Sequence, residues 1–328
     1  MKVLSKDELD IAKNELDNGG LVIFPTETVY GLGANALDFN SVDKIFKAKN
    51  RAKNNPLIVH LKNKDEIPNY AVINNEIEKK LIDIFMPGPF TLILQKKEII
   101  PNNVTCNLDT VGIRIPIDEI AHSLLDRLDY PIAAPSANVS TKPSGTNIYD
   151  IIPEFDGRVN YIINGGDSRI GLESTVCKVI DGIPTILRPG FITKEDIEMV
   201  IGKCNISEFV MKEAKGKVES PGMLYKHYSP VTKCILVDKE LIEKTSKLYT
   251  KPIIIGSNEI FCYKYFNYGD NLVLIAHNIF KLLREADKLD GEVILIEAVK
   301  PTGLGLAIMN RLIRTCEYNY IKRENEDK

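Results

Sequence analysis

Short apolar runs alternate with helix-patterned segments along the first two thirds of the chain. Residues 5–18 place apolar side chains at helical spacing, begin with a capping box of Ser5 and Glu8, and stop at two glycines, which predicts a helix. Residues 21–24 form a short apolar strand that ends at Pro25. Further strand-like runs lie at residues 57–61, 91–95, 111–115, 132–134, 161–163, 175–180 and 185–187, with helical patterns at residues 41–49, 75–85, 118–128 and 194–200. This alternation predicts an α/β domain whose sheet is buried on both faces.

The strands expected between residues 161 and 187 have no long helix between them. Parallel neighbours need a crossover of a dozen residues or more, whereas antiparallel strands can follow each other through a tight turn. The sheet of this domain is therefore expected to be mixed, with some antiparallel pairing near this end of the domain.

The character of the chain changes after about residue 208. Residues 212–220 are polar and typical of a flexible segment, and the next ten residues are bracketed by Pro221 and Pro230. From Cys234 onward, strand-like runs at residues 235–237, 252–255, 272–276 and 293–296 alternate with helical stretches such as residues 278–289, a βαβ rhythm that predicts a small parallel sheet. We therefore expect a first domain at residues 1–207, an interdomain linker at 208–232, a second domain at 233–322 and a charged tail at 323–328.

A glycine-rich stretch at residues 303–308 opens a final helical pattern and partly resembles a dinucleotide-binding fingerprint. It lies near the end of the chain with no βαβ unit after it, so a tight turn that packs a helix on the sheet is the better interpretation. No P-loop, H-E-x-x-H, G-x-S-x-G or kinase signature occurs in the sequence. A nucleotide would therefore have to be held in another way.

Composition adds limits to this picture. The chain has 328 residues and a net charge of −3, which argues against a large basic face for a nucleic acid backbone. No run approaches the ~20 apolar residues of a membrane span, and the charged N-terminus is not a secretory signal. The six cysteines form no C-x-x-C pair, so we interpret them as reduced core residues and expect a cytosolic protein.

Polar clusters follow several of the expected strands, where open α/β sheets place their ligands. The first, residues 25–33, carries hydroxyls, a carboxylate and a phenol between glycines that allow close backbone approach; the alternative is a turn with a capped helix start. The second places Lys47, Lys49, Arg51 and Lys53 between a helix and a strand that ends at His60. Such a run suits a polyphosphate, but it also fits a solvated face, and His60 alone would more often be a core histidine.

Arg114 alternates with isoleucines inside an apolar strand and needs an anionic partner there. From this stretch alone, a buried salt bridge and a substrate carboxylate are equally good partners. Ser136 and Asn138 offer hydrogen bonds beside small residues with room for a flat ligand, and Ser144, Ser174 and Arg188 add further polar groups. Together these clusters indicate a cleft for an anionic ligand.

In these motifs the chain resembles the YrdC-like family, in the long form with an extra C-terminal domain, whose members are threonylcarbamoyladenylate synthases. The motifs that carry the resemblance are Pro25–Gly33, Lys49-x-Arg51 with Asn55-Pro56-Leu57 and His60, Gly112–Pro116, Pro135–Asn138, Glu173-Ser174-Thr175, Arg188-Pro189-Gly190, the linker Ser220–Pro230 and the ending Gly303–Leu312. The resemblance implies an α/β fold: a YrdC-like twisted, mixed open sheet with a second, smaller Rossmann-like parallel-sheet domain.

The resemblance also implies an activity and a site. The enzyme would form threonylcarbamoyl-AMP and pyrophosphate from L-threonine, bicarbonate and ATP with Mg²⁺, as a nucleotidyltransferase acting before a tRNA threonylcarbamoyl transferase in N6-threonylcarbamoyladenosine synthesis. The implied functional tetrad is Lys49, Arg51, Ser136 and Asn138; threonine would be bound by Thr28, His60, Arg114, Ala134 and Ser174, and ATP by Arg51, Asn55, Thr110, Ser136, Ser144, Arg188 and Tyr228. Lys53 stands where the family commonly has a small residue, and no role is assigned to it.

Three further hypotheses accompany this resemblance. Tyr225 and Tyr228 of the linker would close over the cleft and keep water from the labile anhydride. A double-stranded RNA-binding module without catalysis is an alternative that the overall acidity of the chain disfavours. A weak contact with tRNA is compatible with the enzyme interpretation. A carbamoyl-adenylate-forming domain of hydrogenase maturation factors is a second alternative, but those chains carry acylphosphatase and zinc-finger regions that this sequence lacks.

Overall fold

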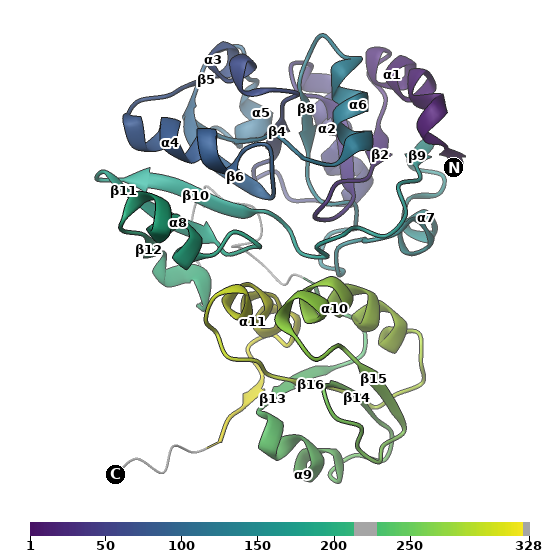
Figure 1. The fold of residues 1–328 in the computed structure, drawn as a ribbon. Helices are drawn as coiled ribbons and strands as arrows, with labels where there is room; N and C mark the ends of the chain where they lie inside the picture. The colour runs from purple at the N-terminus through teal and green to yellow at the C-terminus, as the bar shows by residue number, and fades with distance from the viewer. Residues whose placement is uncertain (213–227, 324–328) are drawn as a thin grey trace. The chain divides into compact units, whose positions relative to one another are not determined.

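The computed structural model describes residues 1–212 and 228–323, and Figure 1 shows its helices and strands. The chain divides into two compact units. Unit 1 comprises residues 1–140 and 144–225, and unit 2 comprises residues 141–143 and 226–328. Each unit has its own sheet.

Unit 1 is built on a mixed sheet with the strand order β1-β9-β2-β3-β8-β4-β7-β6-β10-β11-β12, and β5 pairs with β6 off this path. The strands are β1 (Lys2–Leu4), β2 (Val22–Phe24), β3 (Gly31–Asn35), β4 (Ile58–His60), β5 (Ala71–Val72), β6 (Phe90–Lys96), β7 (Thr110–Arg114), β8 (Ile132–Ala134), β9 (Tyr161–Ile163), β10 (Thr175–Ile180), β11 (Ile183–Arg188) and β12 (Asn205–Ile206). Strands β4 and β7 are parallel, whereas β6 and β8 run antiparallel to their neighbours β7 and β4. The mixed sheet predicted from the sequence is confirmed, and β10 and β11 form the expected antiparallel pair.

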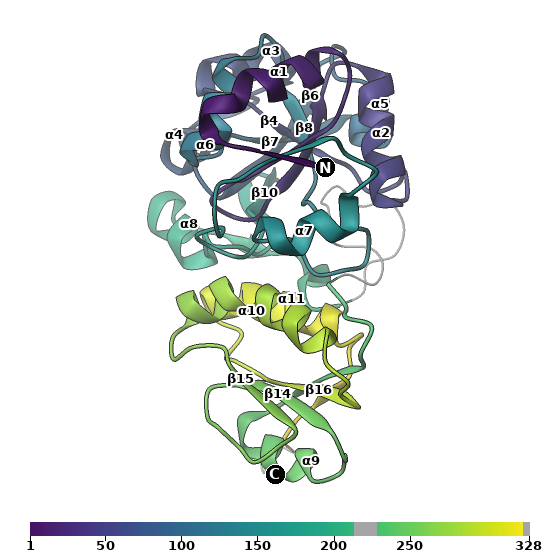
Figure 2. The same ribbon diagram turned by 90° about the vertical axis from the view of Figure 1, so that its right-hand side faces the viewer.

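Two hydrophobic clusters lie on the two faces of this sheet, as the apolar strands predicted. Along β2, Val22 and Phe24 belong to one cluster and Ile23 to the other, which is the period of two expected of a strand covered on both sides. The helical segments of unit 1 are η1 (Lys6–Glu8), α1 (Leu9–Asp17), α2 (Phe39–Lys49), η2 (Lys64–Glu66), α3 (Ile67–Tyr70), α4 (Glu76–Phe85), α5 (Asn102–Thr105), α6 (Glu119–Asp126), α7 (Ile148–Phe155), α8 (Lys194–Ile201) and η3 (Glu208–Val210). Helices α1 and α6 supply one cluster and α2, α4 and α7 the other, and Figure 2 shows these helices around the strands of unit 1.

Local capping fixes where the helices begin. The predicted helix at residues 5–18 starts as the 3₁₀ turn η1 and continues as α1, with the Ser5 amide donating to Glu8 Oε2 at 2.9 Å. Asp38 caps α2 by accepting from the amides of Asn40 and Ser41. At its other end, α2 stops at Asn50, whose φ of 52° is left-handed, so the chain turns sharply after Lys49.

Unit 2 contains the small parallel sheet that the βαβ pattern predicted. Its strand order is β15-β14-β16-β13-β17, and all four pairings are parallel. The elements are β13 (Cys234–Val237), η4 (Lys239–Leu241), α9 (Ile242–Ser246), β14 (Pro252–Gly256), β15 (Lys264–Asn267), α10 (Leu272–Asp287), β16 (Val293–Glu297), α11 (Leu304–Thr315) and β17 (Tyr320–Ile321). Apolar residues of β13, β14 and β16 form the core of this sheet with Ile242 of α9.

The strand predicted at residues 272–276 is wrong, because these residues are the first turn and a half of α10. Asn271 explains the difference: its side chain accepts from the amides of Val273 and Leu274 and caps the helix, a local signal that overrides the strand-like apolar run. The sheet position is filled instead by β15, which pairs with β14.

The boundary predicted at residue 207 is also placed differently. Unit 1 continues through η3 beyond that residue, and residues 228–232 of the predicted linker belong to unit 2. The remaining linker residues with predicted lid function, Tyr225 included, lie outside the described residues. Unit 2 also includes residues 141–143: the Ser229 amide donates to the carbonyl of Thr141 at 2.8 Å, and Arg284 donates to that of Pro143.

The glycine-rich stretch forms a tight turn, as predicted. Gly303 has a φ of +54° and precedes α11, and a Cβ at Gly305 would lie 2.0 Å from the carbonyl oxygen of Lys300. The backbone approach at Gly305 therefore excludes any side chain.

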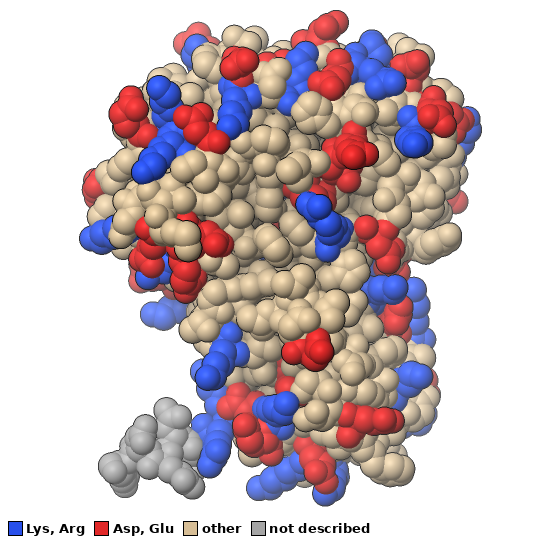
Figure 3. All heavy atoms as spheres, viewed as in Figure 1, with Lys and Arg blue, Asp and Glu red and all other residues tan. Residues whose placement is uncertain are grey.

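The cysteines, the lengths of the helices and the surface charges were each a subject of the sequence analysis. All six cysteines are free, and Cys177, Cys204, Cys234 and Cys316 are buried. None of the helices within residues 1–212 and 228–323 has the length and apolarity to cross a membrane. On the face shown in Figure 3, cationic and anionic side chains are interspersed and no continuous basic area appears.

The turn before α11 yields a test of the second unit. Gly305→Ala is expected to lower the free energy of unfolding by about 2–3 kcal/mol, because the added methyl meets a backbone carbonyl that can move only with its strand-to-helix connection. Chemical denaturation of the full chain measures this loss. Gly182→Asn is the control, since Gly182 has a φ of +74° with nothing within 4 Å and Asn tolerates that conformation. Equal losses in both variants would contradict the steric explanation.

Candidate active site

Lys49 is the last residue of α2, and it is almost fully buried at 1% exposure. Its ammonium donates to the carbonyl oxygens of Ser136 and Asn138, and its own carbonyl accepts from the Ser140 amide at 2.9 Å. A buried cation needs such acceptors to offset lost hydration. The ammonium group thereby holds the end of α2 against the segment that follows β8.

Ser136 and Asn138 complete this cluster. Ser136 pairs with Gly31 in an isolated β-bridge, and its hydroxyl donates to Asn138 Oδ1 at 2.6 Å. The Asn138 amide nitrogen donates to the carbonyl of Val139 at 3.0 Å. Three members of the predicted tetrad, Lys49, Ser136 and Asn138, thus lie in direct contact.

Arg51, the fourth member, follows the left-handed turn at Asn50. Its Nε donates to the Asn55 carbonyl and its Nη2 to the Pro56 carbonyl, both at 3.1 Å. Asn55, a predicted ATP residue, is buried at 3% exposure. The guanidinium therefore shapes the loop that leads into β4.

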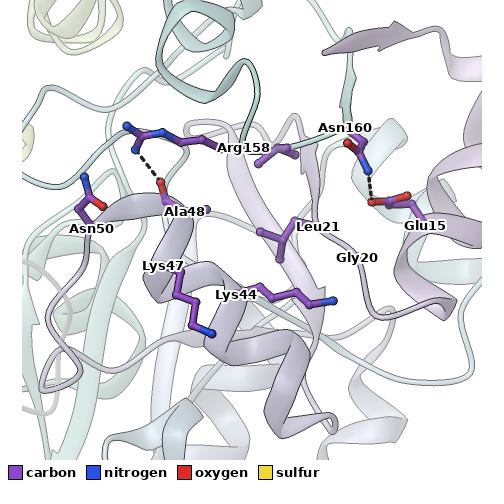
Figure 4. Close-up of a pocket in the computed structure, with 10 residues that line it drawn as sticks. Glu15, Gly20, Leu21, Lys44, Lys47, Ala48, Asn50, Arg158 and Asn160 are labelled. Atoms are coloured by element: carbon purple, nitrogen blue, oxygen red, sulfur yellow. Dashed lines mark hydrogen bonds between the residues drawn. The ribbon is translucent and has the colours of Figure 1, made fainter.

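The run of four cations does not converge on a single site. Lys53 pairs with Asp43 at 2.7 Å, and Lys47 lines a separate pocket of about 480 Å³ together with Lys44 and Arg158. Figure 4 shows this pocket, where Arg158 donates to the carbonyl of Ala48 at 3.0 Å. Of the run, Lys49 contacts the segment that carries Ser136 and Asn138, and Arg51 contacts the loop that leads into β4. Lys47 and Lys49 diverge because successive positions on the last turn of α2 point in different directions.

Two of the predicted threonine residues lie where β4 and β7 end. His60 and Arg114 are the last residues of these parallel strands and stand opposite each other in the register. Ala134 ends the antiparallel strand β8 and therefore stands opposite Ile58, the first residue of β4. Thr28 is fully buried, and its hydroxyl lies 2.8 Å from that of Thr26. We find four of these five residues on adjoining strands or on the loop that crosses them.

Arg114 has a buried ionic partner in the loop after β2. Its Nη2 lies 2.6 Å from Glu27 Oε1, and both side chains are at most 5% exposed. Of the two partners that the sequence left open, the structure contains the protein carboxylate. A further contact with a substrate carboxylate stays a prediction.

A hydrogen-bond chain connects Ser174 with Arg188. Thr91, which stands opposite Arg114 in the β6–β7 register, places its hydroxyl 2.8 Å from that of Ser174. Arg188 donates from Nη2 to the Ser174 hydroxyl at 3.1 Å and to the Ser174 carbonyl at 2.9 Å. A residue predicted for threonine and a residue predicted for ATP are thus directly bonded to each other.

The other predicted ATP residues are distributed more widely. The Ser144 hydroxyl donates to Glu173 Oε1, and both residues are buried. Thr110 begins β7, so it lies at the strand end opposite to Arg114, ~13 Å away at ~3.3 Å per residue. Because β4 and β7 are parallel, Asn55 and Thr110 share one edge of the sheet while His60 and Arg114 share the other.

Tyr228 lies in unit 2. Its ring stacks on Phe280 with centroids 5.1 Å apart, the Arg311 guanidinium lies 5.7 Å from the ring centroid, and Thr315 donates to its carbonyl at 3.1 Å. The side chain is 5% exposed. Its contact with ATP stays a prediction.

Three residues of the site were missed from the sequence. Glu27, Thr91 and Glu173 contact Arg114, Ser174 and Ser144. Glu27 could have been found, because it is the carboxylate of the first polar cluster and Arg114 required an anion. Thr91 had no signal, since a threonine in an apolar strand is ordinary.

His60 is electrically neutral in this environment. Burial, with the nearby charge of Arg114, lowers the pKa of His60 from its ordinary value of 6.5 to about 3. Its Nδ1 lies 3.2 Å from the Ile58 carbonyl, and its ring meets Phe24 edge-on at 6.0 Å. A neutral imidazole donates a hydrogen bond but carries no charge toward a substrate.

No group of three or more His, Cys, Asp or Glu side chains suited to a metal ion occurs among residues 1–212 and 228–323. The side chains of the tetrad itself are two cations, a hydroxyl and an amide, and the Glu154 carboxylate nearby accepts from the Val139 amide at 2.8 Å. A Mg²⁺ ion in this site would therefore take its main ligands from nucleotide phosphates and water.

The lowered pKa of His60 gives a pH-dependent stability. In the unfolded chain the pKa of this histidine returns to near 6.5, so on acidification the unfolded state binds the proton before the folded state does. The contribution of neutral His60 to the stability of the folded state is therefore complete above pH 6.5, and it is lost as the pH falls from 6.5 toward about 3. Compared with His60→Gln, the unmodified protein should lose about 1.4 kcal/mol more per pH unit in this window. Urea unfolding between pH 6.5 and 4.5 measures the difference. His122→Gln is the control, because His122 is exposed beside Asp126; an equal slope for the unmodified protein and His60→Gln would contradict this origin.

Comparisons with known proteins identify the family of the chain. The Sua5/YciO/YrdC family described as "Telomere recombination" matches residues 14–190, and "Threonylcarbamoyl-AMP synthase, C-terminal domain" matches residues 192–316. The chain is 43% identical over 325 residues to threonylcarbamoyl-AMP synthase of Pyrococcus abyssi, covering 96% of both chains. It is 38% identical to threonylcarbamoyl-AMP synthase of Bacillus subtilis, covering 90% of this chain and 88% of the relative.

A solved structure has the same fold throughout. The crystal structure of P. abyssi Sua5 complexed with L-threonine superposes with a TM-score of 0.94 at 41% identity and covers 99% of this chain and 100% of that one. Both family matches, the two-unit architecture and the near-complete coverage agree. The chain is a nucleotidyltransferase-type enzyme that belongs to the threonylcarbamoyl-AMP synthase family in its two-domain form.

Proposed function

We propose that this enzyme forms threonylcarbamoyl-AMP and pyrophosphate from L-threonine, bicarbonate and ATP. The observation that carries the proposal is the arrangement of unit 1: Arg114 lies at one edge of the sheet, and the contacting cluster of Lys49, Ser136 and Asn138 belongs to segments that meet at the other edge. The cation at the first edge suits the carboxylate of an amino acid, and the cationic, hydroxyl-rich cluster at the other edge suits the phosphates of a nucleotide. Such an arrangement would hold the two substrates end to end.

The reaction requires two bonds to form in sequence. The threonine amine first adds to the carbon of bicarbonate with loss of water, giving a carbamate. An oxygen of the carbamate then attacks the α-phosphorus of ATP, and the bond to pyrophosphate breaks. Neither step requires a strong protein base once the amine is unprotonated, so alignment and charge neutralisation contribute most of the acceleration.

The proposed threonine contacts centre on Arg114. Arg114 would bind the carboxylate, while Thr28, neutral His60, Ser174 and the backbone at Ala134 would hydrogen-bond the remaining polar groups. All five residues are at most 4% exposed. Such burial excludes water and strengthens each polar contact.

The proposed ATP contacts offset the charge that collects on the phosphates. Arg51 presents a planar fork and Lys49 a point charge near Ser136, with Asn55, Thr110, Ser144 and Arg188 as further contacts. Mg²⁺ fits a donor set of hydroxyls with phosphate oxygens, and it would neutralise the departing pyrophosphate. Tyr228 and the segment at residues 220–230 are proposed to shield the product from water.

The biological setting is proposed on the same basis. The activated threonylcarbamoyl group would be passed to a tRNA threonylcarbamoyl transferase for modification of the adenosine next to the anticodon, in the cytosol, with at most weak direct contact to tRNA. The near-neutral, interspersed surface charge on the face in Figure 3 supports the enzyme over an RNA-binding module.

Pyrophosphate release tests the proposal. Release from ATP and Mg²⁺ should require both L-threonine and bicarbonate, and Lys49→Ala and Arg51→Ala should each lower the rate by about 100-fold or more, because each removes a charge from the phosphate end. A coupled phosphate assay with each substrate omitted in turn measures this.

Lys53→Ala is the matched control, because Lys53 belongs to the same cationic run but pairs with Asp43 on the surface. Its rate should stay within about twofold of the unmodified enzyme. Release that is indifferent to threonine would indicate a different adenylating reaction. No release under any condition would contradict the proposal.

A further inference from the structure

The Glu27–Arg114 ion pair leaves one carboxylate oxygen and one guanidinium nitrogen without a hydrogen bond. A single contact, from Arg114 Nη2 to Glu27 Oε1 at 2.6 Å, joins them. Glu27 Oε2 and Arg114 Nε are both buried and have no hydrogen-bond partner among residues 1–212 and 228–323. One unused acceptor and one unused donor therefore belong to the same buried pair.

Buried polar atoms without partners are rare in folded proteins, and each costs free energy. Arginine and carboxylate also commonly pair through two parallel bonds, and this pair does not. The unused atoms are therefore better explained by a ligand that binds both groups than by an isolated structural bridge.

The two unused atoms match the two charges of an α-amino acid. The N–H at Arg114 Nε can donate to a carboxylate, and Glu27 Oε2 can accept from an ammonium or amine. In an amino acid these groups are attached to the same carbon, so they must be bound by neighbouring protein groups of opposite charge. Glu27 and Arg114 are such neighbours.

We infer that Glu27 is a substrate-binding residue that holds the α-amino group of threonine while Arg114 holds its carboxylate. This inference rests on the proposed function and adds to it a residue that distinguishes an α-amino acid from the corresponding α-hydroxy acid. Holding the amine orients the nitrogen that must add to bicarbonate. A hydroxyl in its place would offer Glu27 Oε2 only a neutral hydrogen-bond donor in place of a charged one.

A second carboxyl lies in the same pocket as Glu27. The pocket of about 370 Å³ is lined by Glu27, Asp118, Asp167 and Arg169, so its charges are of both signs. Burial, opposed by hydrogen bonds from the Ala121 and Ile120 amides and assisted by the nearby charges of Glu27 and Glu119, raises the pKa of the Asp118 carboxyl. Asp118 is therefore a carboxyl of the same pocket against which the role of Glu27 can be compared.

The loop geometry keeps Glu27 in place without occupying its free oxygen. The Glu27 carbonyl accepts from the Ile170 amide at 2.8 Å, and the Thr28 carbonyl accepts from the Gly171 amide at 3.0 Å. These backbone bonds fix the loop from outside the ion pair. The carboxylate is thus preorganised toward its ligand.

The experiment compares L-threonine with (2S,3R)-2,3-dihydroxybutanoate, in which a hydroxyl replaces the amino group. Calorimetric titration of the full-length unmodified protein should show threonine binding about 10- to 100-fold more tightly, the range of a charge-assisted hydrogen bond. In Glu27→Gln this preference should fall to about threefold or less, because the variant lacks the charge that distinguishes the two compounds. The free energy of unfolding of each variant is measured alongside.

Asp118→Asn is the matched control: it removes one negative charge from the same pocket and keeps a side chain that can cap α6. It should retain the full preference for threonine. L-Threoninamide, which lacks the carboxylate, reports on Arg114 separately. If Glu27 only positioned Arg114, Glu27→Gln would reduce the preference for threonine over L-threoninamide and leave the preference for threonine over the hydroxy acid unchanged. That result would overturn the inference.

The outcomes also separate this inference from the proposed function. If the unmodified protein binds neither threonine nor its analogues, the proposed substrate is wrong. If it binds threonine and Glu27→Gln, folded, keeps the preference over the hydroxy acid, only the role of Glu27 is wrong. If Glu27→Gln fails to fold, Glu27→Asp replaces it, because this variant retains the charge on a shorter side chain. It should bind both compounds more weakly, and its preference for threonine over the hydroxy acid should fall at least threefold. An unchanged preference would overturn the inference.

Discussion

A positive charge inside the sheet of unit 1 imposes the main constraint on this fold. Arg114 ends a strand whose interior residues have no polar side chain, and removing its guanidinium from water would cost several kcal/mol without an anion nearby. Glu27 supplies that anion from a loop far away in sequence. The loop after β2, which also carries Thr28, must therefore reach the end of β7.

The same requirement operates at the other edge, with backbone carbonyls in place of a carboxylate. The ammonium of Lys49 is held by carbonyls after β8, which fixes α2 relative to the strand that carries Ala134. Two buried cations thus tie helix, loop and sheet together at opposite ends of parallel strands. The spacing between those ends is set by strand length.

The sequence predicted the mixed and parallel sheets and most strands, because apolar periodicity is a local signal. It failed where a local cap or a tertiary partner decided the outcome. Residues 272–276 look like a strand, but Asn271 starts a helix there. The four cations of residues 47–53 look like one cluster, but helix geometry and Asp43 disperse them. Glu27 was visible as a carboxylate, yet its pairing with Arg114 spans 87 positions in the chain and depends on the fold.

The assignment of residues 141–143 to unit 2 has a consequence for how the two units are connected. Within the described residues, the chain passes from unit 1 to unit 2 at residues 140–141 and returns to unit 1 at 143–144, and residues 228–323 belong to unit 2. A single cut in the linker would therefore not divide the sequence into the two units. A shortened chain ending at the linker would keep residues 141–143 and lose Ser229 and Arg284, their hydrogen-bond donors. The carbonyls of Thr141 and Pro143 would then have to find other donors, such as water.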